Sequence, residues 1–65
     1  MKGEKRMINI LIAEDYELLR EDLVEMLSEQ QDIQVVGTAK NSEEIIELAQ
    51  TIPFDIILMD IEVYR

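Results

Sequence analysis

The sequence predicts a small α/β domain with element order βαβαβ and a three-stranded parallel sheet in the order 2-1-3. Three observations support this prediction. Apolar runs of strand length alternate with stretches whose apolar residues recur at helical spacing. No internal repeat or low-complexity tract interrupts that alternation. Carboxylates close the first and the last apolar run, at the end of the strands where open α/β sheets bind ligands.

The first strand is predicted over residues 7–13, an apolar run broken only by Asn9. Such a run is typical of a strand that is covered on both faces. A helix is predicted over residues 16–30, with Asp15 as its N-terminal cap. Its apolar face is formed by Leu19, Leu23, Met26 and Leu27. Its acidic ridge is interpreted as a solvated outer face and consists of Glu17, Glu21, Glu25 and Glu29.

The second strand is predicted over residues 33–39, and its polar positions favour a place at the edge of the sheet. A capping box follows, with Asn41 as the cap and Glu44 reaching back to it. It opens a helix that Pro53 ends. The third strand is predicted over residues 56–59, which read as buried on both faces.

Crossovers between parallel strands are right-handed, so the direction of the second crossover decides which face its helix covers. Because the first and third strands read as buried on both faces, we expect a reversal that puts one helix on each face. The first and third strands then lie side by side, and their ends bring together Glu14, Asp15 and Asp60. Three converging carboxylates favour a hard divalent cation with oxygen ligands, and Mg²⁺ is the best candidate.

Composition limits the function of the chain. Its 65 residues suffice for one domain, with residues 1–6 as a polar lead-in and residues 7–65 as the folded part. Fifteen acidic residues against six basic ones give a net charge of −9, which argues against direct binding of nucleic acid or an anionic membrane. The absence of cysteine and histidine excludes thiolate and imidazole ligands. No membrane span or signal peptide is evident, so we expect a cytoplasmic protein.

Three segments resemble the successive motifs of response-regulator receiver domains. They are residues 10–15 (ILIAED) before an amphipathic helix, residues 35–39 (VVGTA) before residues 41–44 (NSEE), and residues 54–62 (FDIILMDIE). The resemblance covers residues 7–62. It implies a flavodoxin-like fold and a role in a bacterial two-component phosphorelay. The pattern is similar to receivers of transcription regulators, and the chain is expected to be a signalling module and not an enzyme.

The resemblance also implies roles for individual residues. Asp60 corresponds to the phosphoacceptor, which takes a phosphoryl group from a histidine kinase. Asp15 would bind Mg²⁺ directly, and Glu14 would bind it through water or by charge alone. Asp60 would share the ion, and Glu62 would contribute its backbone carbonyl.

The sequence departs from the family in length, since receivers contain five strands and only three are predicted here. It therefore resembles the N-terminal half of a receiver. Val63 and Tyr64 stand where the family usually has Met-Pro. A third strand without a further neighbour leaves an unpaired edge. We expect an antiparallel two-fold homodimer in the order 2-1-3-3′-1′-2′, with exchange of elements between chains as the rival arrangement.

Three functional classes remain open from the sequence. The first is a phosphorylated signalling module. The second is a non-catalytic homodimeric assembly unit whose acidic site is a relic. The third is a Mg²⁺-dependent phosphohydrolase, because Asp60-Ile61-Glu62 is similar to the Asp-x-Asp motif of haloacid-dehalogenase-like enzymes. That family carries its motif on the first strand with a second aspartate, which this sequence lacks.

Overall fold

The computed structural model describes residues 6–60, which form three strands and two helices. In chain order the elements are β1 (Ile8–Glu14), α1 (Glu17–Ser28), β2 (Ile33–Ala39), α2 (Ser42–Thr51) and β3 (Ile56–Asp60). Each element that the sequence predicts is present. Strand β2 has the predicted bounds, whereas α1 is shorter than predicted and β3 extends one residue further, to Asp60.

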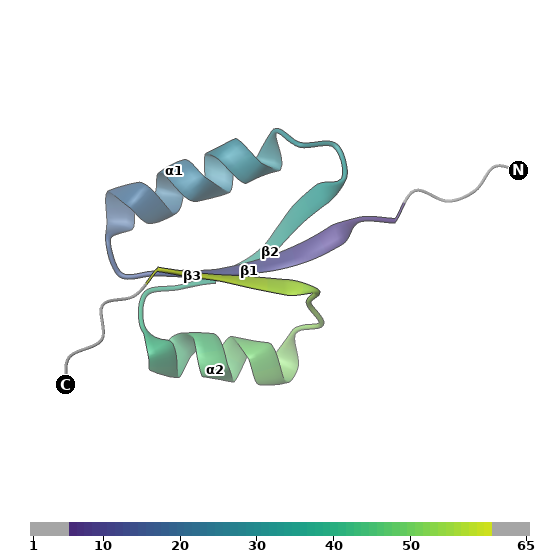
Figure 1. The fold of residues 1–65 in the computed structure, drawn as a ribbon. Helices are drawn as coiled ribbons and strands as arrows, with labels where there is room; N and C mark the ends of the chain where they lie inside the picture. The colour runs from purple at the N-terminus through teal and green to yellow at the C-terminus, as the bar shows by residue number, and fades with distance from the viewer. Residues whose placement is uncertain (1–5, 61–65) are drawn as a thin grey trace, which may run out of the picture.

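The three strands form one parallel sheet in the order β2-β1-β3, as predicted. Helix α1 lies on one face of the sheet and α2 lies on the other (Figure 1). Because the chain leaves β1 toward β2 and then returns past β1 to β3, the direction of winding reverses between the two crossovers. The reversal puts the carboxyl ends of β1 and β3 next to each other, which is the feature that positions the site.

Strand β1 is the centre of the molecule. Its side chains from Ile10 to Glu14 are all buried, and Leu11 and Ile12 have no measurable exposure. Alternation along a strand sends neighbouring side chains to opposite faces. Leu11 and Ala13 belong to the core beneath α2, together with Ile45 of that helix. Ile12, which lies between them in the sequence, points to the opposite face, which α1 covers (Figure 1).

Strand β2 and helix α2 approach closely at Gly37. The pairing of β1 with β2 shifts by one residue between Ile10 and Leu11, so a β-bulge precedes this glycine. A Cβ atom at residue 37 would lie 2.9 Å from Leu11 Cδ2 and 3.4 Å from Leu48 Cδ1. The glycine thus lets the buried leucine and the helix pack against the strand without a gap.

The two helices begin differently, and both beginnings correct a prediction. Tyr16, and not Asp15, is the N-cap of α1, and within residues 6–60 no side chain hydrogen-bonds to the first turn as a cap. At α2 the predicted cap is confirmed, because Asn41 Oδ1 accepts the Glu44 N–H at 2.8 Å. Glu44 Oε1, however, accepts the N–H of Lys40 at 3.0 Å and does not close the box on the cap residue itself.

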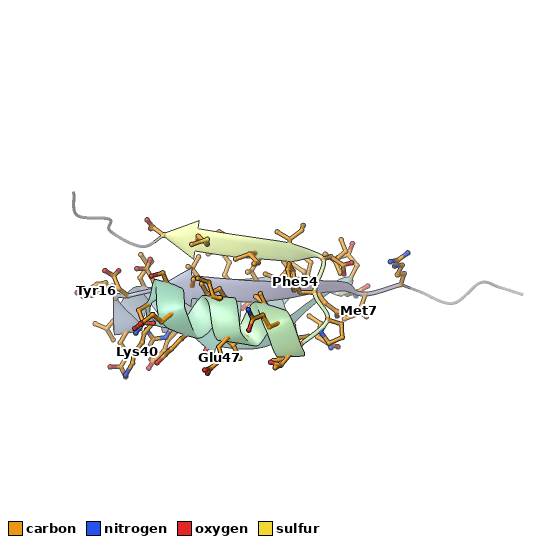
Figure 2. All side chains as sticks on the ribbon, turned by 90° about the horizontal axis from the view of Figure 1, so that it is seen from below. Met7, Tyr16, Lys40, Glu47 and Phe54 are labelled. Atoms are coloured by element: carbon orange, nitrogen blue, oxygen red, sulfur yellow. The ribbon has the colours of Figure 1, made fainter. Side chains whose placement is uncertain are left out.

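Strand β3 is exposed, which corrects the prediction that both of its faces are buried. Within the described part of the chain the backbone of neither helix comes close to that of β3, and Figure 2 shows the strand beyond the edge of α2. Ile56 is 48% exposed and Met59 is 57% exposed. Only Ile57 packs against the core beneath α2 among the residues of this strand. An apolar sequence forms the strand here, but the crossovers leave it uncovered.

Candidate functional site

The carboxyl ends of β1 and β3 bring the predicted acidic residues to one place. Glu14 and Asp60 are direct partners in the parallel pairing of these two strands. Asp15 follows Glu14 in the turn that leads into α1. Figure 2 shows β3 ending at the same end of the sheet as Tyr16, which closes that turn. Glu62, the fourth predicted residue, lies outside the described residues.

Glu14 is the buried member of the group, with a side chain that is only 2% exposed. Its Oε2 atom accepts a hydrogen bond from the Tyr16 backbone N–H at 3.1 Å. Its Oε1 atom is also buried and has no hydrogen-bond partner among the described residues. A buried carboxylate oxygen without a donor is costly. The strand pairing therefore holds a carboxyl group where its charge is only half compensated.

Opposing influences act on the pKa of Glu14, and their sum raises it above its ordinary value of 4.5. The largest one, the hydrogen bond from Tyr16, lowers the pKa because it stabilises the charged form. Burial raises the pKa, as does the close approach of the Asp15 carboxyl. The negative charges of Asp60 and Asp15 raise it further. The acidic residues thus repel one another across the end of the sheet.

Arg20 is the residue at this end that the sequence analysis missed. Its Nη1 atom donates to the backbone carbonyl of Glu14 at 2.8 Å, and its side chain is half-buried. A signal was available, because this arginine is the only basic residue between Met7 and Ala39. It also occupies the flank of the helix between the apolar stripe and the acidic ridge, where a long side chain can reach back to the sheet.

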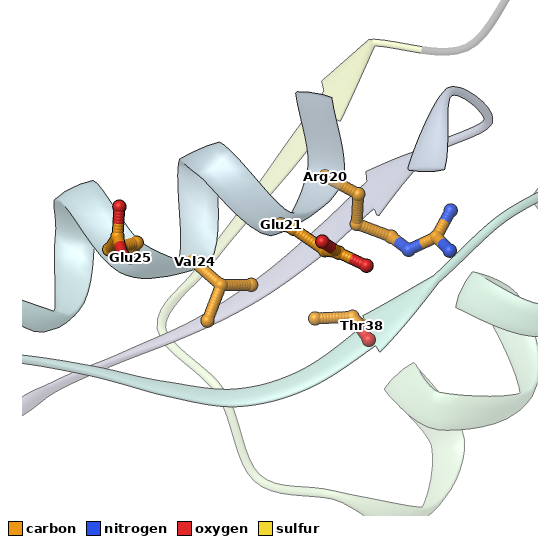
Figure 3. A pocket seen from close by; sticks show the side chains of 5 residues that line it. All are labelled: Arg20, Glu21, Val24, Glu25 and Thr38. Carbon is orange, nitrogen blue, oxygen red and sulfur yellow. The ribbon is translucent and has the colours of Figure 1, made fainter. Parts of the chain in front are cut away.

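A shallow groove of about 320 Å³ lies between α1 and β2, on the side of β1 away from β3. Figure 3 shows its lining, which consists of Arg20, Glu21, Val24, Glu25 and Thr38. Two carboxylates flank the groove, and the apolar atoms of the valine form part of its wall. None of Glu14, Asp15 and Asp60 lines the groove, and only Arg20 lies next to both features. The groove is therefore separate from the candidate site.

The acidic residues offer the type of ligand atom that a magnesium ion prefers. Carboxylate oxygens are the hard ligands that Mg²⁺ takes, and the buried Oε1 of Glu14 has no hydrogen-bond partner in the part of the chain that the structure describes. Within residues 6–60 no three acidic side chains are grouped closely enough to hold a metal ion by themselves. Mg²⁺ usually keeps several waters and uses one or two carboxylates, so a preformed group of three is not required.

A parallel sheet with this strand order and with acids at its switch point defines a class of α/β domain that binds ligands at the carboxyl ends of its strands. Residues 10–64 match the response regulator receiver domain. The chain belongs to that family. The predicted family and fold are therefore confirmed, and with them the link to two-component systems.

Several curated proteins are similar to this chain. The transcriptional regulatory protein LnrK of Bacillus subtilis is 40% identical over 55 residues, which are 85% of this chain and 25% of LnrK. PdtaR, a transcriptional regulatory protein of Mycobacterium tuberculosis, is 43% identical over 56 residues, which are 86% of this chain and 27% of PdtaR. The response regulator GacA of Pseudomonas aeruginosa is 36% identical over 56 residues, which are 86% of this chain and 26% of GacA.

The chain thus spans about a quarter of the length of these relatives. A shorter share, 16%, is covered in a protein-glutamate methylesterase/protein-glutamine glutaminase of Bacillus subtilis, which is 34% identical over 56 residues. The family therefore includes enzymes as well as regulators. No solved structure matches the chain. Neither helix within residues 6–60 is long and apolar enough to cross a lipid bilayer.

Proposed function

We propose that this chain is the phosphoacceptor part of a two-component phosphorelay, with Asp60 as the residue that takes a phosphoryl group from a histidine kinase. Mg²⁺ would be held by Glu14, Asp15 and Asp60, together with the backbone carbonyl of Glu62. The observation that supports this proposal most strongly is the direct pairing of Glu14 with Asp60 at the carboxyl ends of adjacent strands. This pairing puts an exposed carboxylate beside a buried one at the switch point of the sheet.

In the proposed reaction, an Asp60 carboxylate oxygen forms a bond to phosphorus. The bond from phosphorus to the kinase histidine nitrogen breaks, and its electron pair stays on the imidazole. Mg²⁺, when bound, offsets the repulsion between the phosphoryl oxygens and the acidic residues. The exposure of Asp60 leaves it open to a partner, while Glu14 is fixed by strand pairing and by the Tyr16 N–H.

Incubation with acetyl phosphate tests this function without a kinase. We expect the wild-type chain to gain the mass of one phosphoryl group when Mg²⁺ is present and none after chelation. Asp60→Asn removes the acceptor and is expected to abolish the gain. Asp22→Asn is a matched control, because it makes the same change at an exposed aspartate on α1. Equal modification of wild type and Asp60→Asn would contradict the assignment of the acceptor.

The wider biological role is part of the same proposal. The relatives LnrK and PdtaR are transcriptional regulatory proteins, so we expect this chain to serve transcription regulation, in the cytoplasm. Its net charge of −9 disfavours direct contact with nucleic acid or an anionic membrane. The site supports phosphoryl acceptance for signalling, and we assign no enzymatic activity to it.

The exposed β3 favours a second candidate function, a homodimeric assembly unit in which the acids are relics. Unpaired strand edges with apolar side chains readily pair with another chain. An antiparallel pairing of two β3 strands puts Asp60 of one copy near Ile56 of the other. A parallel pairing would instead bring both copies of Asp60 together beside Glu14, which like-charge repulsion disfavours.

Light scattering after size-exclusion chromatography tests the assembly. We expect twice the mass of 7.6 kDa for the wild-type chain. Leu58→Lys puts a charge on the exposed face of β3 and is expected to give a folded monomer. Ile46→Lys is the control, since this residue is 58% exposed on α2, away from that edge. A dimer that survives Leu58→Lys would favour exchange of elements, and a folded wild-type monomer would exclude the assembly.

A further inference from the structure

The turn between β1 and α1 consists of two residues, Asp15 and Tyr16. A helix start normally gains order from a side chain that caps its first N–H groups. Within the described residues, α1 has no such cap. Other contacts hold the turn that carries Asp15, one of the proposed magnesium ligands. One of them is the Tyr16 N–H, which donates to Glu14 Oε2 at 3.1 Å.

Arg20 provides a second contact. Its guanidinium donates to the carbonyl of Glu14, the last residue before the turn, at 2.8 Å. Its backbone N–H donates to the carbonyl of Tyr16, the last residue of the turn, at 2.9 Å. The second of these bonds is the first backbone hydrogen bond of α1, which any residue other than proline would form at position 20, so the arginine side chain itself holds the Glu14 end of the turn. The side chain is half-buried, so packing restricts its movement.

We propose that Arg20 is a positioning residue. By holding the Glu14 carbonyl it fixes the conformation of the turn that carries Asp15. This inference rests on the proposed function, because it concerns the same acidic site. Arg20 acts through the backbone and touches neither the ion nor the phosphoryl group. Partners of this kind, one step removed from the ligands, commonly change metal affinity by about 10–100-fold when they are lost.

Charge alone predicts the opposite result. Arg20 is a cation close to an anionic site, so removing it strengthens the attraction of the site for Mg²⁺. If Arg20 matters only through its charge, a neutral variant binds Mg²⁺ more tightly. If it positions the turn, the same variant binds Mg²⁺ more weakly. The two roles therefore differ in the sign of the effect.

The variants Arg20→Met, Arg20→Lys and Lys40→Met separate these roles. Methionine keeps the aliphatic stem and removes the donors, whereas lysine keeps the charge and N–H donors but loses the planar guanidinium. Lys40 follows β2 at the same end of the sheet, and its hydrogen bond to Glu44 uses the backbone N–H. Lys40→Met is therefore a control that removes a nearby charge without changing a contact to the β1–α1 turn.

Two NMR measurements give the readout: titration with Mg²⁺, and hydrogen exchange of the Asp15 and Tyr16 amides compared with the amides of α2. For Arg20→Met we expect binding about tenfold weaker, with faster exchange in the turn and unchanged exchange in α2. Arg20→Lys is expected to recover part of both. Lys40→Met is expected to bind at least as tightly as wild type.

Unchanged exchange in the turn, with equal or tighter Mg²⁺ binding by Arg20→Met, would overturn the proposal. Should Arg20→Met fail to fold, Arg20→Gln takes its place, because glutamine is also neutral and its shorter side chain loses the reach of Arg20 Nη1 to the Glu14 carbonyl. Unchanged exchange with equal or tighter Mg²⁺ binding in that variant would likewise overturn the proposal. If the wild-type chain itself binds no Mg²⁺, the proposed magnesium site fails. The exchange measurements then still test whether Arg20 holds the turn.

Discussion

The two strands that flank β1 form a comparison within one sheet. Both are parallel to β1, and β3 is the more apolar in sequence. Both helices lie close to the backbone of β2, whereas within residues 6–60 neither lies close to that of β3. The more apolar strand is therefore the less buried one. Residue type decides that a strand forms, but the path of the crossovers decides whether it is covered.

The path explains the difference. Helix α1 connects β1 to β2 and lies over that pair on one face, while α2 returns from β2 toward β3 and lies over the same pair on the other face (Figure 1). The pair β1–β2 is thus enclosed from both sides. Strand β3 is held by its pairing with β1 and by the side chain of Ile57. The candidate site lies on the boundary between the enclosed part and the open part.

The largest expected effect on the free energy of unfolding tests this comparison. It comes from truncating one leucine in the enclosed pair β1–β2 and one in the open strand β3. Leu11 is fully buried, and Leu11→Ala is expected to cost about 2–5 kcal/mol of the free energy of unfolding. A domain of this size has only about 3–10 kcal/mol in total. Leu58 is 38% exposed, and Leu58→Ala is expected to cost about 1 kcal/mol or less. Urea denaturation followed by circular dichroism measures both.

A cost for Leu58→Ala as large as that for Leu11→Ala would break the comparison. It would mean that the face of β3 is covered in solution, as exchange of elements between chains would do and as edge-to-edge pairing of two β3 strands would not. Repeating the measurement at several protein concentrations shows whether a second chain covers β3, since a dimer gains stability with concentration.

A smaller effect is expected where the enclosed part is tightest. Gly37→Ala places a methyl group 2.9 Å from Leu11 Cδ2, and a fully buried leucine has little room to move away. We expect a loss of about 1–3 kcal/mol, the usual range for overpacking. Combining Gly37→Ala with Leu11→Val relieves the contact, so the double variant is expected to lose less than the sum of the singles. Thermal unfolding of wild type, of the two single variants and of the double variant measures this double-mutant cycle. Losses of stability that simply add would contradict the close contact.

The order of the strands and the place of Asp60 could be predicted because they follow from apolar patterns and from the handedness of crossovers. The pairing of Glu14 with Asp60 is a consequence of that order. The exposure of β3 could not be predicted from its own residues. It depends on where two helices lie, and an apolar run looks the same whether or not a helix covers it.

Local hydrogen bonds at the site were harder to predict than the topology. Asp15 has the residue type of a cap, yet Tyr16 takes the cap position and its N–H donates to Glu14. The direction of the backbone at the end of β1 decides whether Asp15 or Tyr16 occupies the cap position, and residue types do not reveal that direction. Arg20 was missed for a related reason, because a base on a helix is usually solvated and its carbonyl acceptor is not visible in sequence.

The smallest effect concerns Glu14, on the boundary itself. Its pKa is raised above 4.5 in the folded chain, so the folded state holds a proton to higher pH than the unfolded state does. The contribution of Glu14 to stability is therefore complete below pH 4.5 and is lost as the pH rises through the folded pKa. Glu14→Gln removes this dependence, and its free energy of unfolding is expected to fall less between pH 4 and pH 7 than that of wild type.

Glu29→Gln is the control for the pH series, because it removes the same charge from an exposed position at the end of α1. Denaturant titrations at several pH values compare the three chains, and only Glu14→Gln is expected to flatten the curve markedly. Mg²⁺ sharpens the test, since an ion at the site favours the charged carboxylate and opposes the loss at higher pH. A wild-type curve parallel to that of Glu14→Gln would show that the acids at the ends of β1 and β3 do not repel one another.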